Sequence, residues 1–183
     1  ADARVNIRGD IDRLGPEVPR GFLKVLARGQ PWEPIPSNRS GRLDLANWIA
    51  SPDNPLTARV AVNRVWGHLI GRGLVETPDN FGFLGEPPSH PQLLDHLAGR
   101  FINEGWSLKQ LIRNIVLSNT YRMSCAFNAQ AVAIDPDNRL LWRMNRRRLD
   151  VEALRDAILS VSGALDSTPG GPALPALNSP MGI

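Results

Sequence analysis

The stretch from Gly41 to Arg122 constrains the fold most strongly, because it contains the start and stop signals of several helices in series. The pattern predicts a first helix over residues 43–50, with Ser40 as a candidate cap and Ser51-Pro52 as the stop. Further amphipathic segments follow, each with boundary residues of its own. A chain with this pattern is expected to be mainly α, an irregular helical bundle.

The second helix is predicted to be central and buried. Asn54 is placed to cap it, Pro55 takes its first position, where a missing N–H costs nothing, and Gly71 supplies a left-handed stop. Its apolar residues cover more than half of the circumference, as in a helix that other segments enclose. These residues are Leu56, Val60, Ala61, Val62, Val65, Trp66, Leu69 and Ile70.

Two further helices are predicted to be neighbours. Capping boxes at Ser89–Gln92 and Ser107–Gln110 mark their starts, and Gly105 ends the first of them. Because only Trp106 lies between that glycine and the next cap, an αα corner or hairpin is expected.

The loop over residues 74–88 holds apolar side chains between glycines and prolines. Loops normally run over the protein surface, where large apolar side chains are unfavourable. We therefore expect Phe81, Phe83 and Leu84 to be tucked in against the helices.

Residues 1–40 are predicted to form a Pro-rich extended arm that packs on the helical domain, residues 41–165. Alternation over residues 4–8 predicts one short strand, and a short helix is expected at most around residues 22–27. Apolar side chains such as Trp32 are too many for a free linker, which is why the arm is expected to lie on the body.

The C-terminal part is predicted to hold one more helix. Asp150 caps it and Gly163 ends it, after a looser stretch over residues 122–135 and a short apolar segment that begins at Pro136. Residues 166–183 are rich in Pro and Gly, and we interpret them as a truncated continuation of the domain.

The chemistry-bearing residues form no established catalytic or metal motif. The three histidines lack the spacing of a zinc-binding helix, and no nucleophile elbow is present. Asp135 and Asp137 resemble the start of a calcium loop, but Arg146 stands where the bidentate Glu is required, so helix capping is their expected role. Cys125 is the single cysteine, which excludes an internal disulfide and c-type haem attachment. We expect a small core side chain there, and the alternative is a free reactive thiol, although no neighbour in the sequence would activate it. No cofactor or metal is expected.

The charge pattern does not by itself favour nucleic acid, because the net charge is only +3. The densest basic segment, residues 139–148, contains five arginines around Trp142 and would suit polyanion contacts, with Arg146, Arg147 and Arg148 as candidate binding residues. We favour a structural role instead, because core-type leucines share the segment. The expected carboxylate partners are Asp44, Asp150, Glu152 and Asp156.

A set of short strings, taken in order and spacing, closely resembles a known family. The strings are Asn54-Pro-Leu-Thr-Ala-Arg59, Val62-Asn-Arg-Val-Trp66, Gly71-Arg-Gly-Leu-Val75, Gly85-Glu-Pro-Pro-Ser-His-Pro91, Glu104-Gly-Trp-Ser107, Ser118-Asn-Thr-Tyr-Arg122, Asp135-Pro-Asp-Asn-Arg-Leu-Leu141 and Arg147-Arg-Leu-Asp150. They resemble the planctomycete-specific domain of unknown function that forms the C-terminal part of large proteins with a cytochrome-c-like domain. The resemblance covers nearly the whole chain, with a departure at Cys125, where Ser is more typical.

The resemblance implies an exported parent polypeptide, periplasmic or at the cell surface, whose other domains are the partners of this one. No catalytic residues carry over, because the family has no established activity. No apolar run reaches the roughly 18 residues of a membrane span. A small-molecule ligand cannot be named from the sequence.

Three functions remain as hypotheses. We favour a non-catalytic structural or interaction module. The alternative is an enzyme domain, carbohydrate- or redox-related, with its site in the 85–91 loop and Glu86 and His90 as candidate catalytic residues. The more distant alternative is polyanion or nucleic-acid binding through residues Arg139 to Arg148.

Overall fold

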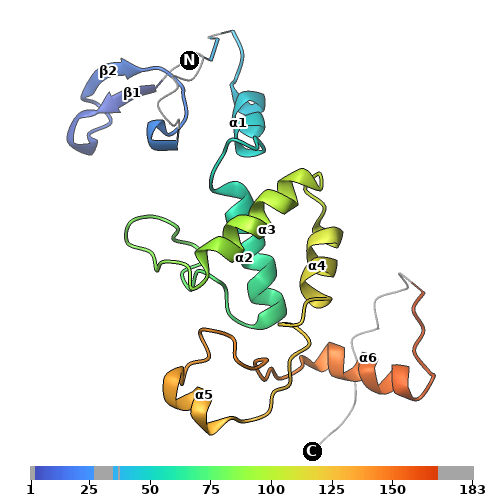
Figure 1. Cartoon of the computed structure of the whole chain (residues 1–183). Helices are drawn as coiled ribbons and strands as arrows, with labels where there is room; N and C mark the ends of the chain where they lie inside the picture. Colours follow the sequence, from blue (N-terminus) through green and yellow to red (C-terminus); the bar gives the residue numbers. More distant parts are fainter. Residues whose placement is uncertain (1–2, 27–34, 37, 169–183) are drawn as a thin grey trace, which may run out of the picture. The chain divides into compact units, whose positions relative to one another are not determined.

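The structure is a computed structural model, and it describes residues 3–26, 35–36 and 38–168 (Figure 1). The chain divides into two compact units, Ala1–Asn145 and Arg146–Ile183. The described elements are mainly helical, which confirms the predicted fold class. They are β1 (Ala3–Asn6), the 3₁₀ turn η1 (Ile7–Gly9), β2 (Leu14–Val18), the 3₁₀ turn η2 (Lys24–Leu26), α1 (Arg42–Ile49), α2 (Thr57–Ile70), α3 (Pro91–Asn103), α4 (Leu108–Val116), α5 (Ala129–Ile134) and α6 (Val151–Val161).

The N-terminal residues form a two-stranded antiparallel hairpin rather than a single strand. Ala3 pairs with Val18, and Arg4 pairs with Glu17. The second strand was not predicted, because it contains Gly15-Pro16, a pair that is typical of a turn between elements. A two-stranded ribbon consists of edge strands only, and edge strands tolerate proline because its missing N–H can face solvent.

The segment after the hairpin contacts α1. The ring of Phe22 stacks on Trp48, with a centroid distance of 5.1 Å and an interplanar angle of 5°. The Arg20 guanidinium donates hydrogen bonds to the carbonyl oxygens of Arg39 and Pro36. Trp32, which was also expected to pack, lies outside the described residues. Packing of the whole arm on the helical body stays a prediction.

Local signals set the boundaries of α2 as predicted. The Asn54 side-chain oxygen accepts the N–H groups of Leu56 and Thr57, and Gly71 ends the helix with φ 98°. At α1 the prediction is wrong by one residue, because left-handed Gly41 occupies the N-cap and no side chain caps the helix. Ser40 only accepts the Arg42 N–H, at 3.4 Å.

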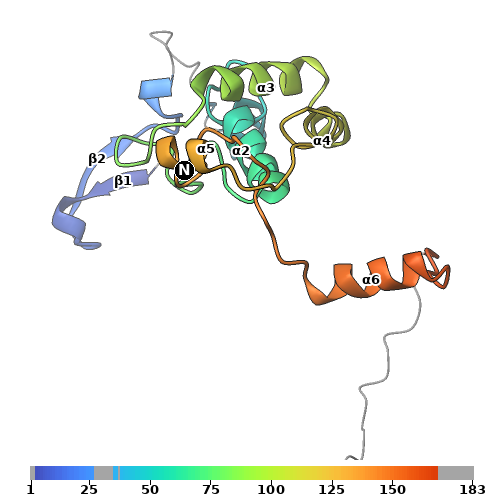
Figure 2. The same cartoon turned by 60° about the horizontal axis from the view of Figure 1, so that its bottom comes forward.

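The core lies between α2, α3 and α4, with α2 at its centre (Figures 1 and 2). The side chain of Val62 is fully buried, and the rings of Phe101 and Trp106 meet edge to face at 5.3 Å. The predicted central position of α2 is therefore confirmed. The buried apolar residues are Ala58, Val62, Trp66, Ile70, Leu74, Val75, Leu94, Leu97, Ala98, Phe101, Leu111 and Ile115.

Of the two predicted capping boxes, only the second forms its serine cap bond. The Ser107 hydroxyl accepts the Gln110 N–H and starts α4. At α3 the N-cap residue is His90, without a side-chain cap bond, and Ser89 instead places its hydroxyl 3.0 Å from His90 Nδ1. The reason is Pro91, which favours the first helical position and so moves the helix start past Ser89.

Hydrogen bonds from polar side chains hold the backbone of the segment after α4. It contains α5, which was not predicted although Asn128 caps it. Asp135 is the C-cap residue of α5, through its backbone N–H, but its buried carboxylate caps no described helix and instead accepts the N–H groups of Arg139 and Leu140, which closes a turn. The turn is tied to α2, since Asn145 donates to the carbonyl of Ile70, a free acceptor at the helix end.

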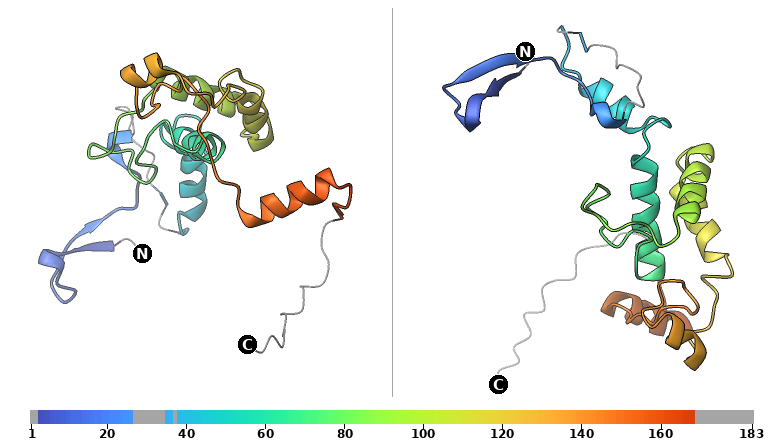
Figure 3. Two further views of the ribbon diagram at one scale, coloured as in Figure 1. Left: turned by 90° about the horizontal axis from the view of Figure 1, so that it is seen from below. Right: turned by 60° about the vertical axis from the view of Figure 1, so that its left-hand side comes forward.

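The second unit contains α6 (Figure 3). Asp150 accepts the Ala153 N–H, and Gly163 follows the helix with φ 74°, so both predicted boundary residues are confirmed. After the helix, hydrogen bonds from Thr168 hold the pKa of Asp166 below its ordinary value. No described helix is long and apolar enough to span a membrane.

Candidate functional site

The loop between α2 and α3 exposes two large apolar side chains. Phe83 is 102 % exposed and Leu84 is 87 % exposed, so the prediction that they tuck into the core is wrong. Phe81 is half-buried and packs against the core cluster, as predicted. This loop therefore has an inner aromatic anchor and an outer apolar tip.

A polar network, rather than burial, organises the loop tip. Thr77 Oγ1 donates to the Asn80 carbonyl at 2.8 Å and accepts the Glu86 N–H at 3.0 Å. The Asn80 side chain accepts the Gly82 N–H at 3.0 Å. Gly85 passes so close that an added Cβ would lie 2.1 Å from the Asn80 carbonyl oxygen, so glycine is required there. The backbone is thus held while the tip side chains remain exposed.

The base of the loop is fixed to α2 by one buried side chain. Asn63, which is 1 % exposed, donates to the carbonyl of Val75 at 3.0 Å and accepts the Val75 N–H at 2.8 Å. Gly73 lies against this pair, since a Cβ there would come within 2.9 Å of both polar atoms of the Asn63 amide.

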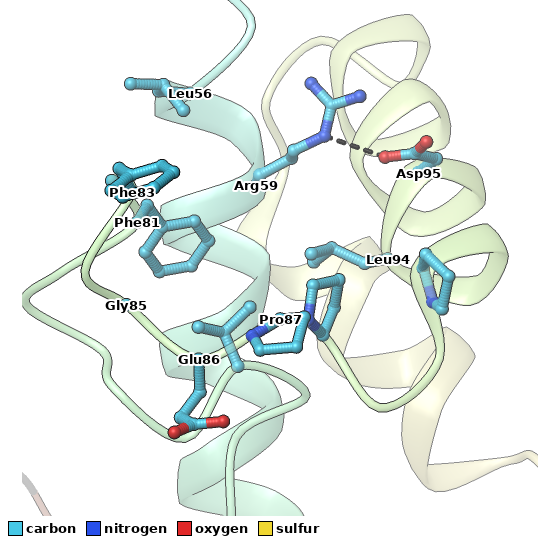
Figure 4. A pocket seen from close by; sticks show the side chains of 13 residues that line it. Leu56, Arg59, Phe81, Phe83, Gly85, Glu86, Pro87, Leu94 and Asp95 are labelled. Atoms are coloured by element: carbon cyan, nitrogen blue, oxygen red, sulfur yellow. Dashed lines mark hydrogen bonds and ion pairs between the residues drawn. The ribbon is translucent and has the colours of Figure 1, made fainter.

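A hollow of about 600 Å³ lies between this loop, α2 and the start of α3 (Figure 4). An ion pair stands at one end, where Arg59 Nε lies 2.7 Å from Asp95 Oδ1, and Arg59 also donates to the Pro55 carbonyl. Most of the wall is apolar. The lining residues are Leu56, Arg59, Val75, Phe81, Gly82, Phe83, Gly85, Glu86, Pro87, Pro88, Pro91, Leu94 and Asp95.

The structure does not bring the two candidate catalytic residues together in this hollow. Glu86 lines it, and its carboxylate lies at the end away from the Arg59–Asp95 pair (Figure 4). His90 is not among the lining residues, and its ring contacts the Ser89 hydroxyl. Among the residues that the structure describes, no group of three His, Cys, Asp or Glu side chains could hold a metal ion.

A second hollow, of about 650 Å³, is lined by residues of α2 and of the stretch from 71 to 79, and four of them are arginines or carboxylates. The exposed ion pair of Arg64 and Asp79 borders it at 3.2 Å, and Arg72 and Glu76 line it at 3.5 Å from each other. Its two arginines and two carboxylates balance, so it favours neither a positively nor a negatively charged ligand.

The comparison with protein families gives a match over residues 41–181, to the family described as a protein of unknown function (DUF1553), PSD1. The chain belongs to this family. No curated protein and no solved structure was found to match it. The apolar loop, both hollows and α6 lie inside the part that the DUF1553 family shares, whereas the β1–β2 hairpin lies outside it.

The five arginines of the basic segment are divided between the two units. In the first unit, Arg139 pairs with Glu76 at 3.5 Å, and the Arg143 guanidinium lies 4.6 Å from the centre of the Trp142 ring. Arg146, Arg147 and Arg148 are exposed and belong to the second unit. Two of the expected carboxylate partners contact other arginines, because Asp44 pairs with Arg39 and Asp156 with Arg155.

The remaining predicted candidate, Cys125, is half-buried and free. It is not part of the buried core cluster, so the prediction that it fills the core is wrong. Asn63, which fixes the base of the loop, was not predicted as a site residue, because an asparagine in a helix is usually a surface residue.

Proposed function

We propose that this DUF1553 domain is a non-catalytic interaction module, which uses the loop over residues 81–88 and the adjacent hollow to hold another segment of a longer polypeptide. The observation that carries the proposal is the exposure of Phe83 and Leu84 on a loop whose backbone is hydrogen-bonded in place. Contiguous apolar side chains that are exposed on the surface of a folded protein mark an interaction site.

The energetics support this proposal. Burial of a Phe or Leu side chain contributes about 1.5–3 kcal/mol, so a partner that covers both tip residues gains affinity from them. The loop is already fixed by Thr77 and Asn80, so little conformational entropy is lost on binding. The apolar wall of the hollow and the position of His90 outside it favour binding over acid–base chemistry.

The proposal also covers the parent polypeptide and the source of the partner segment. On the family resemblance of the sequence, the parent polypeptide is exported and carries a cytochrome-c-like domain, and its other domains supply the partner segment. Polyanion binding through Arg146 to Arg148 is not favoured, because acidic side chains at Asp150, Glu152 and Asp156 offset them within the same unit.

The test is oxidative footprinting of the loop in the intact parent polypeptide and in the isolated chain. We expect Phe83 to be oxidised several times more slowly in the parent, because a partner segment covers it. Phe127, which is 68 % exposed on another loop, is the internal control. Equal oxidation rates of Phe83 in the two samples would overturn the proposal.

A further inference from the structure

We infer that the hollow beside the 81–88 loop binds an extended peptide segment that combines apolar side chains with a lysine or arginine. The inference rests on the proposed function and gives the partner its chemistry. It follows from two features of the hollow, namely the apolar side chains of its wall and the net negative charge of its lining residues.

The wall suits aliphatic or proline side chains. Val75 and Leu94 are 2 % and 3 % exposed and form part of it, and Phe81 adds an aromatic face. A volume of about 600 Å³ is in the range of sites that bury a ligand of several side chains. Aromatic-lined grooves are a typical site for extended, proline-rich peptides.

The charge of the hollow is negative by one unit. Its ionisable residues are one arginine, Arg59, and two carboxylates, Glu86 and Asp95. The Arg59 guanidinium is already engaged by Asp95 and by the Pro55 carbonyl. The Glu86 carboxylate is exposed and makes no ion pair with any residue that the structure describes.

A cationic side chain complements this arrangement, and an acidic one is repelled by it. The ring of Phe83 also lines the hollow, is fully exposed, and can accept a cation over its face. The second hollow offers no such preference, because its arginines and carboxylates balance.

The experiment uses three fluorescein-labelled decapeptides, identical in their leucines and prolines, that carry lysine, glutamine or glutamate at one central position. Binding to the full chain is measured by fluorescence anisotropy at low salt. We expect the lysine peptide to bind about tenfold more tightly than the glutamate peptide, with the glutamine peptide between them. The ratio should shrink as salt is added, because Glu86 is exposed.

Charge variants identify the group responsible. Glu86→Gln should reduce the lysine-to-glutamate ratio to about threefold or less, and Glu86→Lys should invert it. Glu17→Gln, which removes an exposed glutamate from β2, should leave the ratio unchanged. Circular dichroism checks that the variants fold, which is expected because the Glu86 side chain makes no hydrogen bond or ion pair with the part of the chain that the structure describes.

The outcomes separate this inference from the proposed function. A ratio near one, or a ratio that Glu86→Gln leaves unchanged, overturns the partner chemistry. Failure of all three peptides to bind overturns it as well. In each of these cases the proposed function still stands if Phe83 is protected in the intact parent, and it falls if Phe83 is not protected.

Discussion

The side chain of Asn63 pairs with both backbone polar groups of Val75, twelve residues further along the chain. The side-chain amide takes the place of a neighbouring strand for the backbone of Val75. Both residues are buried from solvent. Val75 lines both hollows, so the pair holds one wall residue that they share. The base of the apolar loop is therefore held to α2 by one buried amide.

Replacement of Asn63 by alanine should destabilise the fold strongly. The change leaves the N–H and C=O of Val75 buried without partners, each of which costs about 1–3 kcal/mol. We expect a loss of about 2–4 kcal/mol in the free energy of unfolding, measured by urea denaturation. Asn119→Ala, at an exposed position, is the control and should change it by less than about 0.5 kcal/mol. Equal losses in the two variants would show that the Asn63 pairing does not hold the loop.

Two glycine-to-alanine changes should act in opposite directions. At Gly73 the new Cβ would lie 2.6 Å from the Val75 carbonyl oxygen, so Gly73→Ala should lower stability by about 1–3 kcal/mol. At Gly99, in the exposed part of α3, a Cβ meets nothing within 4 Å, so Gly99→Ala should raise stability by about 0.5–1 kcal/mol. Thermal denaturation followed by circular dichroism measures both. A stabilising Gly73→Ala would contradict the close approach.

The two serines before α3 and α4 should differ in their contribution to stability. Ser107 caps α4, so Ser107→Ala should cost about 1 kcal/mol. Ser89 does not cap α3, so Ser89→Ala should cost less than about 0.5 kcal/mol. Urea denaturation of the two variants side by side gives the comparison, and the reverse order would mean that Ser89 is the true cap.

The two phenylalanines of the loop should separate stability from binding. Phe81 packs on the core, and Phe81→Ser should cost about 1–2 kcal/mol of folding free energy. Phe83 has no burial to lose, so Phe83→Ser should leave stability within about 0.5 kcal/mol while it weakens peptide binding. The measurement is urea denaturation of each variant. A large loss in Phe83→Ser would mean that its ring is buried in solution.

Part of the candidate site could be predicted from the sequence. The position of Phe81, Pro87 and Glu86 in an apolar loop before a helix was visible, and Glu86 was identified as a candidate. What could not be seen was that Phe83 and Leu84 point outward, because the same composition fits a buried loop equally well. The exclusion of His90 from the hollow also depended on how the loop meets α3.

By itself, the sequence determined the helix boundaries whose hydrogen bonds span two to four residues. Asn54, Gly71, Ser107 and Asp150 act on their immediate neighbours, so their roles are fixed wherever the helices lie. Only the tertiary structure decided the contacts between segments far apart in the chain. The bond from Asn145 to Ile70 joins residues 75 positions apart. Such a pairing exists only after the helices have packed, since packing is what removes the water that would otherwise satisfy both groups.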